Sequence, residues 1–577
     1  MTARIPSSAN GDVSGDRAPG FAELFTPKLV TVLREGYTGA HLKADAIAGL
    51  TVAIVALPLS MAIAIASGVS PAQGLTTAII GGFLVSALGG SRFQIGGPAG
   101  AFIVLVATTV ATHGVEGLVL ATFLSGLMLV VAGLLRLGTY VKFVPYPVTV
   151  GFTAGIAVII FASQVKDLLG LQLSGPEPGP LAEKLPVLWA ALPDFDAASA
   201  ALAGATIAVI VLLKRWRPAW PGLLVAIALA GLVTALAGLP VETIGSRFGG
   251  IPSSLPMPSL PDLSLQRIVA VLPSALAFTL LGSIESLLSA VVADGMSGRR
   301  HRSNCELVGQ GIANAGSALF GGFCVTGTIA RTATNVRSGA HGPVAGILHA
   351  LFLLVFMLVA APLAAYIPLA SLAGLLAVVA WNMIERHAFA TLLRASRGDA
   401  LVLLTTFGLT VLRDVTEAIV VGFALGSVLF IHRMSQITAV ETHLPFVAED
   451  QADTPDGRRQ PYDEASAVDP QVVVYRISGA FFFGAAASIA AVLERIADSH
   501  KALVIDFAAV PFLDSTAAHS IESLAGKATR RGVAVILTGT APEIRRQLAV
   551  QGLVAPLVTY AATLDEGLRH ARAATGS

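Results

Sequence analysis

The sequence predicts a polytopic α-helical membrane protein with about 14 transmembrane helices, followed by a small α/β domain. Three observations support this fold class. Charged residues make up only 13% of the 577 residues and hydrophobic residues 54%, whereas soluble domains carry about 25% charged residues. Glycine and proline are frequent, at 58 and 31 residues, which indicates the interrupted helices that channels and transporters use. The charges are also distributed unevenly along the chain.

The charge distribution divides the chain into a membrane body and two polar ends. Residues 1–44 hold 9 charges and residues 436–577 hold 28, so only 36 remain for the 391 residues between them. The predicted parts are a cytoplasmic N-terminal tail over 1–44, a transmembrane domain over 45–435, a linker over 436–469 and a soluble domain over 470–577. The first 40 residues contain no secretory signal peptide, and residues 1–21 are expected to be disordered. The charged linker is expected to be flexible.

Composition and motifs exclude several classes of protein. A net charge of +1 gives no sign of a nucleic-acid partner. The two cysteines, Cys305 and Cys324, lie in or near apolar stretches, where a disulfide framework is not expected. The sequence has no metal-ligating cluster, P-loop or catalytic triad, so we predict no enzyme, no cofactor and no metal site.

Fourteen apolar segments are long or apolar enough to be predicted as membrane-embedded helices. They are 46–66, 72–89, 97–112, 116–135, 146–165, 198–213, 219–239, 268–293, 304–320, 325–337, 343–365, 367–384, 400–413 and 415–432. Segments 97–112 and 325–337 are short, open with glycine-rich sequence and stand third in each half of seven. Matching interruptions of this kind predict an inverted-repeat transporter with a binding site at the interrupted helices.

The basic residues orient the predicted helices in the bilayer. With the N-terminus inside, the inside loops contain 14 Lys and Arg residues and the outside loops contain five. The positive-inside rule therefore predicts a multi-pass protein of the plasma (inner) membrane with both termini in the cytoplasm. The two long outside loops, 166–197 and 240–267, are rich in proline and are expected to be irregular.

One carboxylate lies deep within a predicted span. Glu285 stands nine residues before Asp294, which at about 1.5 Å per residue places it roughly 14 Å from the helix end, near the bilayer midplane. Such a carboxylate is protonated, paired or directed at a polar cavity, and Ser289 shares its helix face. Glu285 is either a structural residue bonded to a neighbouring helix or a proton or coupling-ion site. The second interpretation is favoured because intramembrane carboxylates mark ion pathways.

The second intramembrane charge is Arg331, in FGGFCVTGTIARTATN. A half-helix is predicted to begin near Val325 to Thr328, where free N–H groups and the helix dipole form an anion site. Arg331 adds a positive charge one turn into that helix. It could bind an anion, pair with Glu285, or extend toward the membrane surface as a structural residue.

A matching half-helix is predicted after Gly96-Gly97-Pro98-Ala99-Gly100-Ala101. Proline suits a first helical turn and glycine permits close approach of a ligand. Two such helix N-termini would converge on one point. In the first span, Ser60 follows the mid-membrane Pro58 and could hydrogen-bond either a ligand or its own backbone.

Several motifs together make the chain similar to the sulfate permease (SulP) family of anion transporters, over nearly its whole length. They are GGSRFQIGGPAGAF at 89–102, ESLLSAVVADGMSG at 285–298, ELVGQGIAN at 306–314, GTIARTATN at 327–335 and AVVAWNM at 377–383. The resemblance implies a 7+7 inverted repeat divided into a core and a gate, a homodimer, and an elevator-like cycle.

The resemblance also implies a substrate site between the third and tenth helices, beside the first and eighth. Carried over to this sequence, the substrate-binding residues are Ser60, Ala99, Gly100, Ala101, Gly327, Thr328 and Arg331, and the coupling residues are Glu285 and Ser289. The substrate is a small anion, and the motifs resemble those of bacterial members assigned to sulfate or to C4-dicarboxylates such as succinate.

Two departures from the family pattern bear on coupling. Where members often carry a glutamine and an aromatic residue, this chain has Leu59 and Ile63. Sodium-coupled bicarbonate members tend to carry Asp with Thr one turn later, whereas here the pair is Glu285 and Ser289, and Arg331 would repel sodium. We therefore expect proton symport rather than sodium symport. Bicarbonate transport, anion exchange, a channel and a non-transporting scaffold are the alternatives.

The C-terminal region has a small β/α pattern, with strands near 471–479, 502–507 and 533–538 and helices near 485–499, 515–530 and 541–550. It resembles a STAS domain, through VIDFAAVPFLDSTAAHSI at 504–521. In soluble relatives a Ser or Thr of this loop can be phosphorylated, which here would be Ser515 or Thr516. The alternative is a polar N-cap for the next helix. A cytoplasmic partner of this domain is also conceivable from the resemblance.

Overall fold

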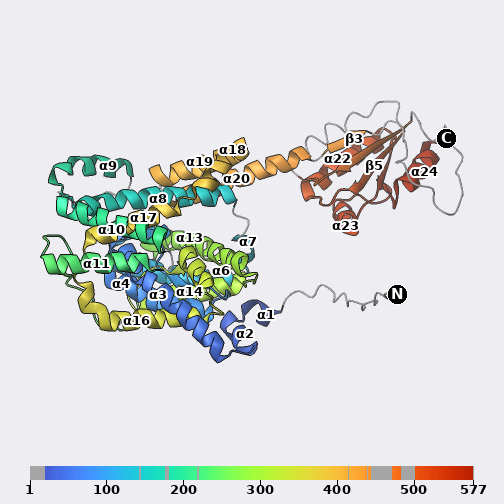
Figure 1. Ribbon diagram of the computed structural model, residues 1–577. Coiled ribbons are helices and arrows are strands. Elements are labelled where there is room, and N and C mark those ends of the chain that lie inside the picture. Colours follow the sequence, from blue (N-terminus) through green and yellow to red (C-terminus); the bar gives the residue numbers. More distant parts are fainter. Residues whose placement is uncertain are drawn as a thin grey trace, which may run out of the picture. The chain divides into compact units, whose positions relative to one another are not determined.

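The computed structural model describes residues 20–141, 145–173, 175, 181–217, 220–413, 415–437, 439–442, 471–482 and 501–575. The chain divides into two compact units, Met1–Phe423 and Ala424–Ser577. The first is a body of packed helices and the second contains a β-sheet (Figure 1). Each has its own hydrophobic core.

Two short helices precede the first span, although the sequence places them in a tail. They are α1 (Phe21–Phe25) and α2 (Lys28–Arg34). Arg302 donates hydrogen bonds to the Thr26 carbonyl at 2.9 Å and to Thr31 Oγ1 at 2.8 Å, and Arg92 pairs with Glu35. Arg92 thereby holds the pKa of the Glu35 carboxyl below its usual value. Partners distant in sequence thus hold two helices in place within the predicted tail, and Phe21 is helical although it was expected to be disordered. Residues 1–19 lie outside the described residues.

The spans follow in the predicted order. They are α3 (Gly39–Ala66), α4 to α5 (Pro71–Leu88), η2 (Gly100–Phe102) with α6 (Ile103–Leu134), α8 (Tyr146–Leu169), α10 (Ala197–Trp216), α11 (Gly222–Ala237), α13 (Leu265–Ser297), α14 (Ser303–Leu319), α15 (Ile329–Arg337), α16 (Val344–Ala364), α17 (Leu369–Met383), α19 (Arg397–Leu412) and α20 (Val415–Ile437). Predicted segments 97–112 and 116–135 merge in α6, where Gly114 with φ of 70° marks the boundary between them. Among the described helices, nine are long and apolar enough to cross a membrane.

Helices α6 and α14 cross at glycines, which allows their backbones to approach closely. A Cβ on Gly311 would lie 2.5 Å from the Gly126 carbonyl oxygen, and a Cβ on Gly126 would lie 2.6 Å from the Gly311 carbonyl oxygen. Small residues at such crossings are a common packing device in membranes. This crossing holds together two helices that flank the interrupted segments.

Gly311→Ala should therefore destabilise the protein by about 1–3 kcal/mol, because the two backbones must separate. Thermal unfolding in detergent measures the effect. The matched control is Gly204→Ala on α10, where a Cβ meets nothing within 4 Å, and which should be neutral or stabilising by about 0.4–1 kcal/mol. Equal melting temperatures for the two variants would contradict the close crossing.

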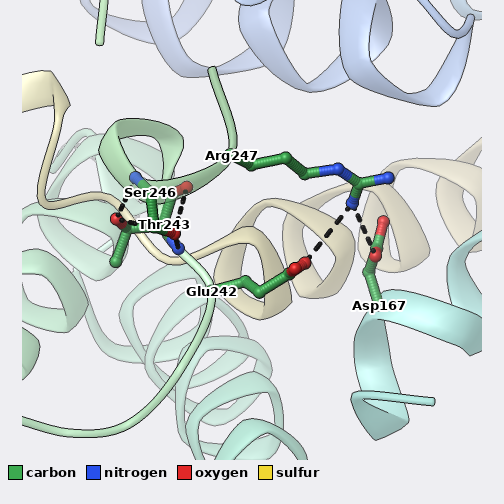
Figure 2. Close-up of polar contacts among 5 residues, drawn as sticks. All are labelled: Asp167, Glu242, Thr243, Ser246 and Arg247. Atoms are coloured by element: carbon green, nitrogen blue, oxygen red, sulfur yellow. Dashed lines mark hydrogen bonds and ion pairs between the residues drawn. The ribbon is translucent and has the colours of Figure 1, made fainter. Parts of the chain in front are cut away.

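The long loops after α8 and α11 contain more regular structure than expected. They include α9 (Leu181–Ala190) and α12 (Ile244–Phe248). In Figure 2, Arg247 of α12 contacts Asp167 at 3.5 Å and Glu242 at 3.6 Å, while Thr243 and Ser246 form the capping box that begins α12. The expectation of irregular loops is wrong here because local capping and ion pairs stabilise a short helix.

The second unit contains a five-stranded sheet of order β3-β4-β5-β6-β7. Its strands are β3 (Ala439–Thr442), β4 (Val472–Ser478), β5 (Ala502–Ala509), β6 (Ala534–Thr538) and β7 (Thr559–Ala561). Strands β4 to β7 pair in parallel and β3 pairs antiparallel with β4. The helices described in this unit besides α20 are α22 (Ser515–Arg530), α23 (Pro542–Val550) and α24 (Leu564–Thr575).

Three predicted strands and two predicted helices of this unit are therefore confirmed. The predicted helix over 485–499 lies outside the described residues. Strand β3 falls within the predicted linker, because an edge strand of four residues, one of them the charged Glu441, gives little hydropathy signal. The rest of the linker, 443–469, also lies outside the described residues.

Candidate functional site

The two interrupted segments meet in the membrane body through a short β-ladder. Strand β1 (Gly96–Gly97) pairs antiparallel with β2 (Thr326–Gly327). Directly after these strands come the N-termini of η2 and α15. Thr328 N–H and Oγ1–H both donate to the Ile95 carbonyl, at 3.0 and 3.1 Å. The predicted convergence of two half-helix N-termini is confirmed.

Arg331 lies at this crossing and is 2% exposed. Its Nη2 donates to Ser60 Oγ at 3.2 Å and to the Pro98 carbonyl at 3.3 Å. Its Nε and Nη1 have no hydrogen-bond partner in the part of the chain that the structure describes. A Cβ built on Gly97 would lie 2.4 Å from Nη1, so only glycine leaves room for the guanidinium there. The geometry excludes a side chain extended toward the membrane surface.

Ser60 links the first span to the same point. It is fully buried on α3, two residues after Pro58. Its hydroxyl accepts from Arg331 at 3.2 Å. The sequence left two roles open for Ser60, and the geometry favours the one in which its side chain takes part in the site.

Glu285 lies on the face of α13 that contacts the second half-helix. Three residues earlier, the Gly282 carbonyl lies 3.4 Å from Thr326 Oγ1, and one turn later Ser289 Oγ lies 3.1 Å from Thr332 Oγ1. Because positions three and four apart share a helix face, Glu285 points toward the segment that carries Arg331. Its carboxylate forms no ion pair or hydrogen bond with any described residue, so the two intramembrane charges are not paired.

The remaining predicted residues lie around the same crossing. Ala99 is the N-cap of η2 and Ala101 lies within it, and both are buried, at 8% and 3% exposure. Gly100 faces α8 and α17, since a Cβ there would lie 3.4 Å from Ile160 and 3.5 Å from Met383. Gly327 packs against the Gln94 side chain. The structure thus gathers all seven predicted substrate-binding residues around the crossing of β1 and β2.

Sequence reasoning missed a third intramembrane charge, Glu306. This residue is fully buried in the first turn of α14. It accepts from Gln94 Nε2 at 2.7 Å and from Ser91 N at 2.9 Å, and it lies 3.3 Å from Ser286 Oγ. It therefore joins the segment before β1 to α13 and α14. A glutamate this close to a predicted helix end gives no local sign of burial, although the motif ELVGQGIAN contains it.

Glu306→Ala should destabilise the protein by about 2–5 kcal/mol, because it leaves buried donors of Ser91 and Gln94 without an acceptor. A thermal melt in detergent checks this. The control is Glu116→Ala, whose side chain is 81% exposed and whose loss should change stability by less than about 0.5 kcal/mol. An unchanged melting temperature for Glu306→Ala would argue against the network.

A second residue that sequence reasoning missed is His349 on α16. It is fully buried, and neither ring nitrogen has a partner among the described residues. A Cβ on Gly82 would lie 3.7 Å from its Cε1, so the imidazole packs against the helix that leads to β1. An isolated histidine in an apolar stretch gives no sequence signal for such a position.

In the second unit, Ser515 and Thr516 are exposed at the start of α22. The N-cap of α22 is Asp514, whose carboxylate accepts from Ala517 N at 2.8 Å. Neither hydroxyl is needed as the cap, and both face solvent. The buried Asp506 within β5 accepts from Arg476 Nε at 2.8 Å.

Comparison with known proteins decides the family. The sulfate permease family model matches residues 42–406, and the STAS domain model matches residues 465–567. The chain belongs to the sulfate permease family. The resemblance drawn from the motifs is thereby confirmed, and the protein is a transmembrane anion transporter and not an enzyme.

Among the relatives of this sulfate permease member is the putative sulfate transporter YvdB of Bacillus subtilis, 40% identical over 90% of this chain and 95% of that protein. The bicarbonate transporter BicA of Picosynechococcus is 32% identical over 88% of this chain and 90% of that protein.

Solved structures agree with the fold. The murine Solute Carrier 26 family member A9 anion transporter in the inward-facing state superposes with a TM-score of 0.83 at 16% identity, over 99% of this chain and 100% of that one. The transmembrane domain of a cyanobacterial BicA gives a TM-score of 0.59 at 33% identity, over 68% of this chain and 98% of that one. The arrangement of about 14 membrane helices with a STAS domain fits the family.

Proposed function

We propose that this transporter is a proton-coupled symporter of sulfate or a similar small divalent anion. The observation that carries the proposal is the buried Arg331 guanidinium at the crossing of the two half-helices. It retains N–H donors without a partner among the described residues, and buried cations are expected to be paired. A small oxyanion would supply the missing charge and acceptors.

The proposed anion site consists of Ser60, Ala99, Gly100, Ala101, Gly327, Thr328 and Arg331. The N-termini of η2 and α15 add their positive dipole ends. In the planar guanidinium, the Nε–H and Nη1–H groups of Arg331 have no partner among the described residues, and each can donate a charge-assisted hydrogen bond to an anion oxygen. Sulfate and a carboxylate both provide acceptors of this kind.

Glu285, with Ser289 beside it, is the proposed coupling group. Its carboxylate faces the half-helix of Arg331 without a protein partner among the described residues. A neutral, protonated glutamate beside a bound divalent anion avoids repulsion between like charges. Loading of the proton and the anion would therefore favour each other, which is the requirement for symport.

A second candidate is bicarbonate transport, because the BicA relatives are bicarbonate transporters. C4-dicarboxylate transport, anion exchange and channel conduction use the same positive site and are further alternatives. A non-transporting scaffold that signals through the STAS domain is a less favoured one.

The family likeness supports further proposals about the setting of this site. The chain would act as a homodimer in the plasma (inner) membrane, with both termini in the cytoplasm, and move its core against its gate in an elevator-like cycle. Residues 1–44, 45–435, 436–469 and 470–577 remain the proposed functional divisions. The exposed Ser515 and Thr516 are proposed phosphorylation sites, through which a cytoplasmic partner could be recruited.

The test is uptake into proteoliposomes of the purified full chain. Labelled sulfate, succinate and bicarbonate are compared under an inward proton gradient, an inward sodium gradient, and no gradient. Accumulation of sulfate or succinate with the proton gradient alone supports the proposal. Sodium-driven bicarbonate uptake would replace it with the second candidate, and strict anion-for-anion exchange without pH dependence would replace it with an exchanger.

A further inference from the structure

A cluster of exposed basic and aromatic side chains lies at one end of the membrane body; we call it the basic rim. It consists of Lys214, Arg215, Trp216, Arg217, Trp220, Trp381, Arg386, Arg394 and Arg397, all of which are exposed. The three indoles are 71%, 60% and 56% exposed, in chain order. The orientation proposed above places this rim on the cytoplasmic side.

Contacts between two stretches distant in sequence form the rim. Helices α10 and α17 pack against each other, and at their ends Lys214 Nζ lies 3.2 Å from Asn382 Oδ1. Helix α18 (Arg386–Ala395) follows shortly after the end of α17. Its first residue, Arg386, places its guanidinium 4.8 Å from the centre of the Trp381 ring. Basic residues of both stretches therefore lie near one another.

Helix α18 has the properties of an interfacial helix. It contains no buried residue, and its Phe389 ring contacts Phe407 of α19 edge-on at a centroid distance of 5.7 Å. One face is thus attached to the membrane body while Arg386 and Arg394 remain exposed. A short amphipathic helix with basic residues lies in the plane of the headgroups.

The positive charge of the rim is not neutralised within the part of the protein that the structure describes. None of its six Lys and Arg residues forms an ion pair there. Two acidic residues lie nearby in sequence: Glu385 accepts from Tyr146 at 3.4 Å, and Asp399 accepts from Ser396 at 2.7 Å. They offset only part of the six positive charges. Six exposed cations therefore give this end of the membrane body a positive surface that can attract anions.

We propose that the basic rim binds headgroups of anionic phospholipids in the adjoining leaflet. Clusters of four to eight Lys and Arg next to membrane helices attract such headgroups, and tryptophan is enriched at headgroup depth. Three exposed indoles distinguish the rim from a site for a soluble anion, because indoles gain little from contact with free phosphate. The rim thus holds α18 and the end of α10 at the membrane surface.

The test measures lipid enrichment with the tryptophans of the rim. The chain has four Trp residues, so a Trp189→Phe parent of the full chain leaves Trp216, Trp220 and Trp381 as reporters. It is reconstituted with brominated phosphatidylglycerol or brominated phosphatidylcholine at equal mole fraction. Quenching by the anionic lipid should exceed quenching by the neutral lipid about threefold, since each basic residue near the surface attracts an anionic lipid.

The variant R215Q/R217Q/R394Q/R397Q should bring this quenching ratio to about one, as should 1 M salt, where the Debye length falls to about 3 Å. The milder R394Q/R397Q should give an intermediate ratio if the fourfold variant does not fold. The matched control R267Q/R413Q removes two arginines of predicted outside loops and should leave the ratio unchanged.

A ratio of one in the parent, or an undiminished ratio in folded R394Q/R397Q, would overturn the proposal. Loss of the preference on adding millimolar inorganic phosphate at constant ionic strength would also overturn it, because the rim would then be a site for a soluble anion. The readout needs no transport, so it is independent of the proposed substrate and coupling.

Discussion

Replacing Glu285 with glutamine should abolish anion uptake driven by a pH gradient while leaving anion binding measurable. Glutamine keeps the size and polarity of the side chain but cannot release or bind a proton. It mimics the protonated glutamate, so binding of a divalent anion beside Arg331 should be retained or strengthened. The measurements are proton-driven uptake in proteoliposomes, expected to fall at least 100-fold, and equilibrium binding of labelled anion in detergent.

The control for this experiment is Glu116→Gln, which removes a carboxylate whose side chain is 81% exposed and should leave uptake unchanged. Downhill exchange of labelled for unlabelled anion should persist in Glu285→Gln, since exchange needs no net proton movement. Undiminished proton-driven uptake by the Glu285→Gln protein would exclude proton coupling through this residue.

Arg331→Ala should weaken anion binding by about 100-fold, that is by about 3 kcal/mol, because hydrogen bonds to charged groups contribute about 1.5–3 kcal/mol each. Arg331→Lys keeps the positive charge but loses the fixed planar donors of the guanidinium, so it should restore only part of the affinity. Binding of labelled sulfate to the purified variants, with the KM for uptake, provides the measurement.

Arg337→Ala is the matched control, because it removes an exposed arginine from the same short helix and should leave the affinity unchanged. The melting temperature separates binding from folding, since a folded variant that has lost only the anion contact still gives a cooperative melt. An Arg331→Ala protein that binds sulfate as tightly as the parent would exclude a direct contact. Retained biological phenotype without transport would then favour the signalling scaffold.

The sequence determined the number and order of the spans because hydropathy is a local property of each segment. Every predicted span contains a helix, and the short segments at 97–112 and 325–337 coincide with the two interruptions. Local pattern also predicted most of the described sheet. The edge strand β3 and the helices α1 and α2 were not predicted, because the contacts that stabilise them come from residues far away in the chain.

The sequence by itself identified Glu285 and Arg331 as charges within spans, since an ionised side chain inside a bilayer is costly wherever it points. Only the tertiary structure decided which side chains contact these two charged groups. Antiparallel pairing of β1 with β2 accompanies the contact of Arg331 with Ser60, whereas Glu285 has no ion-pair partner among the described residues. The tertiary structure also revealed the buried Glu306, whose hydrogen-bond partners are separated from it by up to 215 residues in sequence. Contacts across such distances in sequence depend on how helices pack, which no local pattern contains.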